Sequence, residues 1–252
     1  GEDLGTEYVV DLLKRFELSK DEHYQLFEYC NSNDITYLCT PWYSSSLEFL
    51  EEMGVLAYKV ASADLTNIPL IELLIQTQKP LILSTGMSTT DEIKFTSSVL
   101  DKTDTEYAFL HCNSTYPAPL EDINLNWISK LKKIHATVGY SGHERGISVT
   151  IAAATMGISI IERHFTLDRN MEGPDHAASL EFDEFSKLVV GVREVEAALG
   201  SANEERLLSQ GEMINRENLS KSLVSSGPLK SGLILSAENI AVKSPGQGIS
   251  PQ

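Results

Sequence analysis

The chain has 252 residues, of which 42% are apolar, so it can form one large domain or two smaller ones, each with a buried core. Its formal net charge of −16 predicts a surface that repels nucleic acids and acidic membranes, and we expect neither as a partner. No uninterrupted apolar run approaches the roughly 20 residues that a membrane-spanning helix needs.

The first predicted elements are two helical pieces within residues 8–32, joined by the capping signal "LSKDE". Beyond them, short apolar runs alternate with helical patterns at intervals of about 20 to 30 residues, which is typical of parallel βα units. Strands are expected at residues 35–40, 57–62, 80–86, 107–112, 136–142 and 158–164. Helices are expected at residues 45–54, 68–77, 89–101, 126–133, 147–157 and 182–199.

Polar residues cluster where the predicted strands end, as Lys59, Ser84, His143 and His164 illustrate. A (β/α)8 TIM-type barrel has its active site at this face, with groups contributed by several strands. A doubly wound sheet usually carries a Gly-rich turn after its first strand, but neither GxGxxG nor GK[ST] occurs in this sequence. The α/β pattern of residues 1–200 therefore predicts a TIM-type barrel.

Six predicted strands are fewer than the eight of a closed barrel, and an open arc would expose two long strand edges. We therefore expect the first two βα units to be absent from this chain, with the barrel completed by sequence not shown here. Residues 201–221 are predicted to be a polar linker. Residues 222–252 predict short strands with turns, as at the start of a small β-rich domain that is truncated before it can bury a core.

The three cysteines, Cys30, Cys39 and Cys112, are widely spaced and form no CxxC pair. An odd, dispersed set of this kind favours a reducing compartment and argues against a structural zinc site. We therefore expect a cytoplasmic protein.

His143 and His164 end two neighbouring strands, so their side chains can approach each other at one face of a parallel sheet. Two imidazoles together with water or substrate oxygens can hold a divalent metal ion with open positions. The alternative is that each is a hydrogen-bonded polar residue at a barrel mouth. His111 is a third candidate, for which a supporting role is equally expected, and His135 is predicted to be exposed.

Lys59 lies within "AYKVAS", a strand that should otherwise be buried. An unpaired buried ammonium is strongly disfavoured, so the residue is expected to meet an anion. It could bind a phosphate or carboxylate, or it could form a Schiff base. The alternative is a lysine that extends from the strand end into solvent.

Hydroxyl groups surround the same predicted rim and could bind phosphate oxygens. They belong to Ser62, Ser84, Thr85, Ser114 and Ser141. Tyr116 is held in the proline-bracketed loop "STYPAP" and could line a sugar or anion pocket, or simply pack.

Two acids of the last βα unit complete the candidates. Asp175 follows Gly173 and Pro174, a rigid turn that could direct its carboxylate over the pocket. Glu162 could orient a histidine or pair with Arg163. The alternative for both acids is an ion pair in a solvent-exposed loop.

Six segments in order carry a close resemblance to a known family: "YKVASADLTN", "ILSTGMST", "LHCNSTYPAP", "GYSGH", "IIERHFTLDRNMEGPDHAASLE" and "VKSPGQGISP". They resemble the sialic acid synthases, a family of N-acetylneuraminate synthases and bacterial relatives that make legionaminic or pseudaminic acid. The resemblance runs from about residue 35 to the end of the sequence. Its specificity lies in the ordered set rather than in any single motif.

The resemblance implies a barrel joined to a small C-terminal antifreeze-like domain, which reaches into the partner's active site in a domain-swapped homodimer. The implied reaction condenses phosphoenolpyruvate with an open-chain N-acetylated hexosamine. It releases phosphate and yields a nine-carbon 2-keto sugar acid.

Site residues are implied by the same motifs. His143 in "GYSGH" and His164 in "ERHF" match the family's ligands for Mn2+ or Mg2+, which would polarise the sugar aldehyde. Thr40 lies beside phosphoenolpyruvate, and Tyr116 and Asp175 match positions that face the sugar. The residues that match phosphoenolpyruvate contacts are Lys59, Ser62, Ser84, Ser114 and Ser141.

The sequence departs from the family pattern at several positions. The family's first two strands supply an acid–base candidate and a second phosphoenolpyruvate-binding lysine, and neither is present here. Asp64 stands where some members have glutamate; with Lys59, it is our predicted catalytic residue. Ser114 replaces an asparagine of some members. Ser244 stands where sialic acid synthases often carry an arginine that contacts the acyl group, which weakens the case for N-acetylmannosamine as the acceptor.

A metal-dependent, phosphoenolpyruvate-using synthase is the leading hypothesis. A barrel aldolase that uses Lys59 as a Schiff base is a second enzyme class. A non-catalytic or truncated homologue that keeps the fold for binding or assembly is a third reading.

Overall fold

The computed structural model describes residues 14–201 and 205–252. The chain forms two compact units, residues 1–200 and residues 201–252. Within the described residues, every helix is too short or too polar to cross a bilayer.

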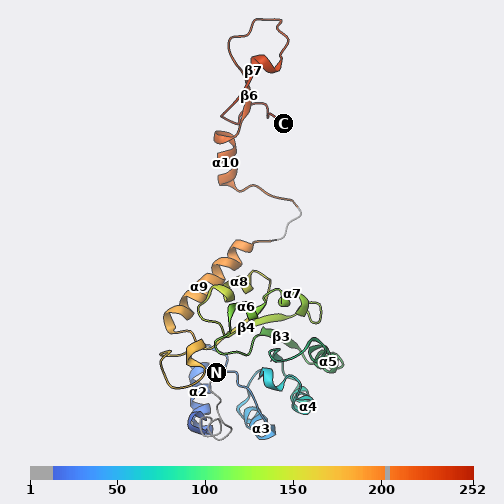
Figure 1. The fold of residues 1–252 in the computed structure, drawn as a ribbon, viewed down its shortest axis with the longest axis vertical. Coiled ribbons are helices and arrows are strands. Elements are labelled where there is room, and N and C mark those ends of the chain that lie inside the picture. Colours follow the sequence, from blue (N-terminus) through green and yellow to red (C-terminus); the bar gives the residue numbers. More distant parts are fainter. Residues whose placement is uncertain (1–13, 202–204) are drawn as a thin grey trace. The chain divides into compact units, whose positions relative to one another are not determined.

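A parallel five-stranded sheet forms the centre of the larger unit, and Figure 1 shows the helices arranged around it. The strands lie side by side in chain order: β1 (Tyr58–Val60), β2 (Leu81–Ser84), β3 (Tyr107–Cys112), β4 (Val138–Gly142) and β5 (Ile160–Arg163). Every neighbouring pair is parallel. Parallel neighbours need crossover connections, which the helices supply. This confirms the prediction of consecutive βα units, as in part of a TIM-type fold.

The predicted strand at residues 35–40 is wrong, because this segment has no regular secondary structure. It runs beside β1, where the amide of Lys59 donates to the carbonyl of Cys39 at 3.4 Å. One long hydrogen bond does not make a ladder. The apolar pattern was misleading because Ile35 and Leu38 remain 60% and 40% exposed instead of packing against a layer of helices.

The helices of the larger unit follow the predicted order. They are α2 (Lys20–Ser32), α3 (Ser44–Met53), α4 (Ile68–Gln76), α5 (Thr90–Leu100), α6 (Leu120–Ile123), α7 (Trp127–Leu131), α8 (Ser148–Ala154) and α9 (Phe182–Leu199). Helix α2 begins at a capping box made by Ser19 and Glu22, as "LSKDE" predicts. The helical piece predicted before it lies largely outside the described residues. The single turn α6 was not predicted, because four residues give no readable periodicity.

The outer face of the sheet packs against the helices and forms the core. Register aligns Val60 with Leu83 and Leu83 with Phe109, and all three are at most 1% exposed. Each large apolar side chain buried in this way contributes about 1.5–3 kcal/mol. The helices contribute further buried residues to the same cluster, which include Leu50, Leu74, Ile93 and Leu131.

The inner face of the sheet carries the polar residues, because alternate residues of a strand point to opposite faces. Register pairs Cys112 with Ser141 and Ser141 with Glu162, so that these three side chains share one face. Lys59 pairs with Ile82, two residues before Ser84, which places both polar side chains on the same inner face. The sheet thus separates an apolar outer layer from a polar inner one.

The smaller unit contains α10 (Gln210–Leu219) and an antiparallel pair of strands, β6 (Ser222–Ser225) and β7 (Ile240–Lys243). The expectation of linker over residues 201–221 misses α10. This helix begins at a capping box of Ser209 and Glu212. None of its residues is buried, so it lacks the apolar stripe by which an amphipathic helix is detected.

Candidate active site

His143 and His164 lie next to each other just beyond the ends of β4 and β5. The last register pair of these strands is Gly142 with Arg163, so the two imidazoles follow directly at the carboxyl edge of the sheet. Their ring centroids are 5.0 Å apart and their planes are inclined by 73°. The structure therefore brings these two predicted residues together, at a distance from which both rings can reach one ligand.

Each histidine has its own electrostatic environment. The Nδ1 atom of His143 is 2.7 Å from the carbonyl oxygen of Asn113, which leaves Nε2 available. Burial lowers the pKa of His143, but Cys112 and the Asn113 carbonyl raise it by more, so that the pKa lies above its ordinary value. Burial also lowers the pKa of His164, and here it prevails although Asp175, 3.7 Å from Nδ1, opposes it.

Tyr116 lies over both histidines. Its ring centroid is 4.2 Å from that of His143 and 5.7 Å from that of His164. Burial raises the pKa of Tyr116 to about 12, so its hydroxyl stays protonated and can donate a hydrogen bond near neutral pH. A hollow of about 390 Å³ adjoins the pair on the side of His164 and includes Asp175 in its lining.

Lys59 and Glu162 form the other end of the site. The ammonium donates to the carbonyl of Val60 at 2.8 Å and lies 3.7 Å from the Glu162 carboxylate. The hydroxyl of Ser141 donates to the same carboxylate at 2.7 Å. Burial lowers the pKa of Lys59, although Glu162 opposes the shift. Glu162 therefore pairs with Lys59 across the inner face, rather than with Arg163 as sequence allowed.

Cys112 connects the two ends, and sequence reasoning gave it no place in the site. Its sulfur lies 3.6 Å from the hydroxyl oxygen of Ser62 and 3.7 Å from that of Ser114. The same sulfur lies 3.7 Å from the ring nitrogen Nδ1 of His143. Burial raises the pKa of the thiol, but His143, Ser62 and Ser114 lower it by more. Its position as the last residue of β3 was the available signal.

Gly86 has a steric role beside this thiol. A Cβ at this position would lie 2.1 Å from the Ser114 hydroxyl and 2.8 Å from that of Ser62. The amide of Gly86 also donates to Ser62 at 3.1 Å. The glycine thus lets the main chain after β2 approach both serines.

Three further predicted residues differ in their hydrogen bonds. Ser84 is 2% exposed, and its hydroxyl has no hydrogen-bond partner among the described residues. Thr85 instead donates to the carbonyl of Leu110 at 2.9 Å. Asp64 accepts from Asn67 at 2.9 Å through one oxygen, while its other oxygen is buried and unpaired within the described residues.

Thr40 lines a hollow of about 290 Å³ together with Phe16, Trp42 and Phe49, none of which is a predicted site residue. His111 lies on the outer face of the sheet, two residues after Phe109 in β3. Its ring lies against Tyr140, and Nε2 is 2.7 Å from the carbonyl of Ile123, as expected of a supporting residue.

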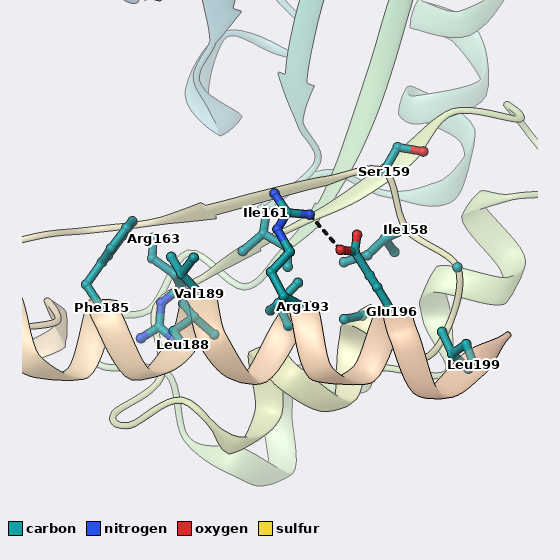
Figure 2. Close-up of a pocket in the computed structure, with 13 residues that line it drawn as sticks. Ile158, Ser159, Ile161, Arg163, Phe185, Leu188, Val189, Arg193, Glu196 and Leu199 are labelled. Atoms are coloured by element: carbon teal, nitrogen blue, oxygen red, sulfur yellow. Dashed lines mark hydrogen bonds and ion pairs between the residues drawn. The ribbon is translucent and has the colours of Figure 1, made fainter. Parts of the chain in front are cut away.

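A further hollow of about 370 Å³ lies between β5 and α9, and Figure 2 shows its lining. Side chains such as Ile158, Ile161 and Val189 make it largely apolar, and Arg193 and Glu196 form an ion pair of 2.6 Å there. Arg163 extends from β5 toward α9 (Figure 2). This hollow is therefore on the helix side of the sheet, opposite the face that carries the polar residues.

Comparison with known proteins gives the family. The model of the NeuB family matches residues 2–204. The chain belongs to the NeuB family. This confirms the resemblance to the sialic acid synthases that the ordered motifs indicated.

Similar proteins agree with this assignment. An uncharacterised protein of Methanocaldococcus jannaschii is 43% identical over 241 residues, which are 95% of this chain and 71% of that protein. The N,N'-diacetyllegionaminic acid synthase of Campylobacter jejuni is 37% identical over 245 residues, which are 96% of this chain and 73% of that enzyme.

A solved structure shares the fold. The N-acetylneuraminic acid synthetase of Leptospira borgpetersenii, crystallised with citrate, superposes with a TM-score of 0.79 at 34% identity. The match covers 84% of this chain and 74% of that one. The fold and the family therefore agree across most of the described residues.

Proposed function

We propose that this NeuB-family chain condenses phosphoenolpyruvate with an open-chain N-acetylated hexosamine. Water is consumed, phosphate is released, and the product is a nine-carbon 2-keto sugar acid of the sialic, legionaminic or pseudaminic acid type. Support comes from the family match and from relatives named as such synthases. The observation that carries the proposal is the row of groups on the inner face, which runs from Lys59 through Glu162 and Cys112 to the paired histidines.

We propose that the two histidines hold a divalent cation, Mn2+ or Mg2+. His143 directs Nδ1 to a carbonyl and so presents Nε2, the arrangement common in metal-binding histidines. No cluster of three or more His, Cys, Asp and Glu side chains surrounds one point within residues 14–201 and 205–252. Two imidazoles leave positions open for substrate oxygens. When bound, the ion would act as a Lewis acid on the sugar aldehyde.

The Lys59 end of the site suits the anionic substrate. The global charge of −16 opposes binding of phosphoenolpyruvate, so a local cation is needed. Lys59 supplies it, and the Glu162 carboxylate raises the pKa of Lys59 against the larger lowering effect of burial. The unpaired hydroxyl of Ser84 would gain a hydrogen-bond acceptor from a phosphate or carboxylate. Ser62 and Ser114, whose hydroxyls lie 3.6 and 3.7 Å from Cys112 Sγ, remain further predicted contacts.

The histidine end suits the sugar. Tyr116 can donate a hydrogen bond through its protonated hydroxyl, and Asp175 can accept one from a sugar hydroxyl. Asp64 remains our candidate for acid–base work, since its buried Oδ2 has no hydrogen-bond partner among the described residues. Thr40 remains a predicted contact to phosphoenolpyruvate.

The proposal extends to assembly and location. Within the described residues the parallel sheet has five strands, and we propose that they form part of a (β/α)8 barrel. We propose that the smaller unit belongs to an antifreeze-like domain, which completes the site of a second copy in a domain-swapped homodimer. We also propose a cytoplasmic location, with which three free thiols are compatible.

The test is phosphate release from phosphoenolpyruvate with a panel of 2-acetamido and 2,4-diacetamido hexoses. We expect release to require one of these sugars, to stop with a chelator, and to be lost in His164→Ala even at raised Mn2+. Glu196→Gln, in helix α9 on the outer side of the sheet, is the matched control and should retain activity. Release that needs no divalent metal would contradict the proposal.

A Schiff-base aldolase is the second candidate, and the lowered pKa of Lys59 favours it. Borohydride reduction with a keto-acid substrate separates the two. Covalent trapping at Lys59 would support the aldolase. Absence of both trapping and phosphate release across the panel would support a non-catalytic homologue.

A further inference from the structure

The two histidines lie one residue beyond the last register pair of β4 and β5, so they do not themselves form a ladder pair. Their own carbonyls are held elsewhere, His143 by the amide of Ala118 and His164 by that of Leu180. A direct connection between the two strand tips comes from their neighbours in sequence. Glu144 follows His143, and Arg163 precedes His164.

Arg163 holds both the side chain and the main chain of Glu144. Its Nη1 atom donates to the Glu144 carboxylate at 2.8 Å, and Nη2 donates to the Glu144 carbonyl oxygen at 2.5 Å. Nη1 also donates to the carbonyl of Gly146 at 2.9 Å. The guanidinium therefore grips the main chain immediately after His143 from the residue immediately before His164.

This pair is fully enclosed. Both side chains are 0% exposed, and the carboxylate also accepts from the Tyr140 hydroxyl at 2.7 Å and from the Thr150 hydroxyl at 2.8 Å. Gly142 provides the space, because a Cβ there would lie 2.7 Å from Glu144 Oε2. Because the guanidinium is planar and makes several hydrogen bonds in one fixed geometry, it holds the two main-chain segments at a defined separation better than a single flexible contact would.

We propose that Glu144 and Arg163 are positioning residues, which set the separation and orientation of the His143 and His164 rings from the outer side of the sheet. Neither touches the inner face, so their effect passes through the main chain. The consequence for metal binding rests on the proposed function. The effect on ring geometry does not.

The test uses the full chain and a double variant, Glu144→Gln with Arg163→Met. Removing both charges avoids leaving one buried ion without a partner, so the fold is expected to survive. In this variant we expect the Kd for Mn2+, measured by isothermal titration, to rise roughly 10–100-fold, the range seen when partners behind metal ligands are removed. We also expect loss of the nuclear Overhauser effect between the two histidine rings in the metal-free protein.

A matched control removes a second ion pair, that of Lys79 and Glu51 at 2.5 Å, which adjoins the start of β1 rather than the strand tips. Glu51→Gln with Lys79→Met should leave both readouts unchanged. Retention of the ring contact and of the Mn2+ affinity in a folded Glu144/Arg163 double variant would overturn the proposal. Weakening in the control pair of equal size would also overturn it.

The outcomes separate this proposal from the proposed function. If the parent chain binds no Mn2+, the proposed metal site fails and the ring contact alone decides on positioning. If the double variant does not fold, Tyr140→Phe decides, because it removes one bond to Glu144 and keeps both charges. We expect it to weaken Mn2+ binding about threefold, or to weaken the ring contact. No change in either readout would overturn the proposal.

Discussion

The two sides of the β4–β5 junction use similar chemical groups in opposite ways. On the inner side, Glu162 accepts from Ser141 and lies 3.7 Å from the ammonium of Lys59, and the Glu162 side chain is 36% exposed. On the outer side, Glu144 accepts three hydrogen bonds and is paired with Arg163 without any exposure. A carboxylate with spare capacity can meet a substrate. A fully satisfied one can only hold structure.

The same contrast separates the histidines. His111 is enclosed on the outer side and bonded to a main-chain carbonyl, and burial lowers its pKa. His143 is on the inner side, where Cys112 and Asn113 more than offset burial and raise the pKa. Burial alone therefore does not distinguish a structural group from a candidate catalytic one. The groups that contact each imidazole distinguish the two cases.

The largest expected effect comes from breaking the outer pair on one side. Arg163→Met leaves Glu144 buried without its cation and should lower the free energy of unfolding by about 3–5 kcal/mol. Urea unfolding measures it. Lys79→Met is the matched control. Its pair with Glu51 is partly exposed, so it should lose less than ~1 kcal/mol. Equal losses in the two variants would contradict the contrast.

Filling the space behind the outer pair should have the next largest effect. In Gly142→Ala, the added methyl would meet Glu144 Oε2 and Tyr140 Cε1 at 2.7 Å, so we expect about 1–3 kcal/mol of destabilisation. Gly211→Ala, in helix α10 with nothing within 4 Å of the added atom, is the control and should be neutral or slightly stabilising. A Gly142→Ala protein as stable as the control would show that the junction is loosely packed.

On the inner side, Glu162→Gln should change the free energy of unfolding little, but it should clearly change the pKa of Lys59. Glu162 raises the pKa of Lys59 against the effect of burial, so its neutralisation should lower that pKa further. Nuclear magnetic resonance of 13C-methylated Lys59 measures the pKa directly. Glu196→Gln, which removes the partner of Arg193 instead, should leave it unchanged. A higher pKa of Lys59 in Glu162→Gln would contradict the assigned pairing.

The smallest effect concerns pH and His111. Because burial lowers its pKa in the folded state, the unfolded chain binds its proton more readily. Stability from this residue is therefore complete above the unfolded pKa of about 6.5 and is lost as pH falls below it. Between about pH 7.5 and 5.5, the parent should lose more unfolding free energy than His111→Gln does. Identical losses would show that His111 does not titrate on unfolding.

The sequence was sufficient to predict the βα order and the proximity of His143 and His164, because the carboxyl ends of consecutive parallel strands meet at one edge of the sheet. It was insufficient for residues 35–40, where an apolar pattern is present without a partner strand to pair with over its length. It also missed α10, whose capping box is present but whose apolar stripe is not.

Within the site, the sequence suggested candidate residues but not which of them pair with each other. It offered Arg163 as a partner for Glu162, yet the two side chains lie on opposite faces because they are adjacent in one strand. Glu144 was overlooked because a glutamate in a loop reads as solvated, and only the tertiary structure shows it enclosed. Cys112 was treated as a redox indicator, although its place at the end of β3 put it beside His143.

The most direct test of the central claim is to follow phosphoenolpyruvate labelled with 13C at carbon 2, with Mn2+ and an N-acetylated hexosamine, by nuclear magnetic resonance. The account predicts that the enol resonance is replaced by that of a hemiketal carbon in a new carbon chain, with one phosphate released for each, and that His164→Ala abolishes the change. Conversion to pyruvate alone, or the same product from His164→Ala, would contradict it.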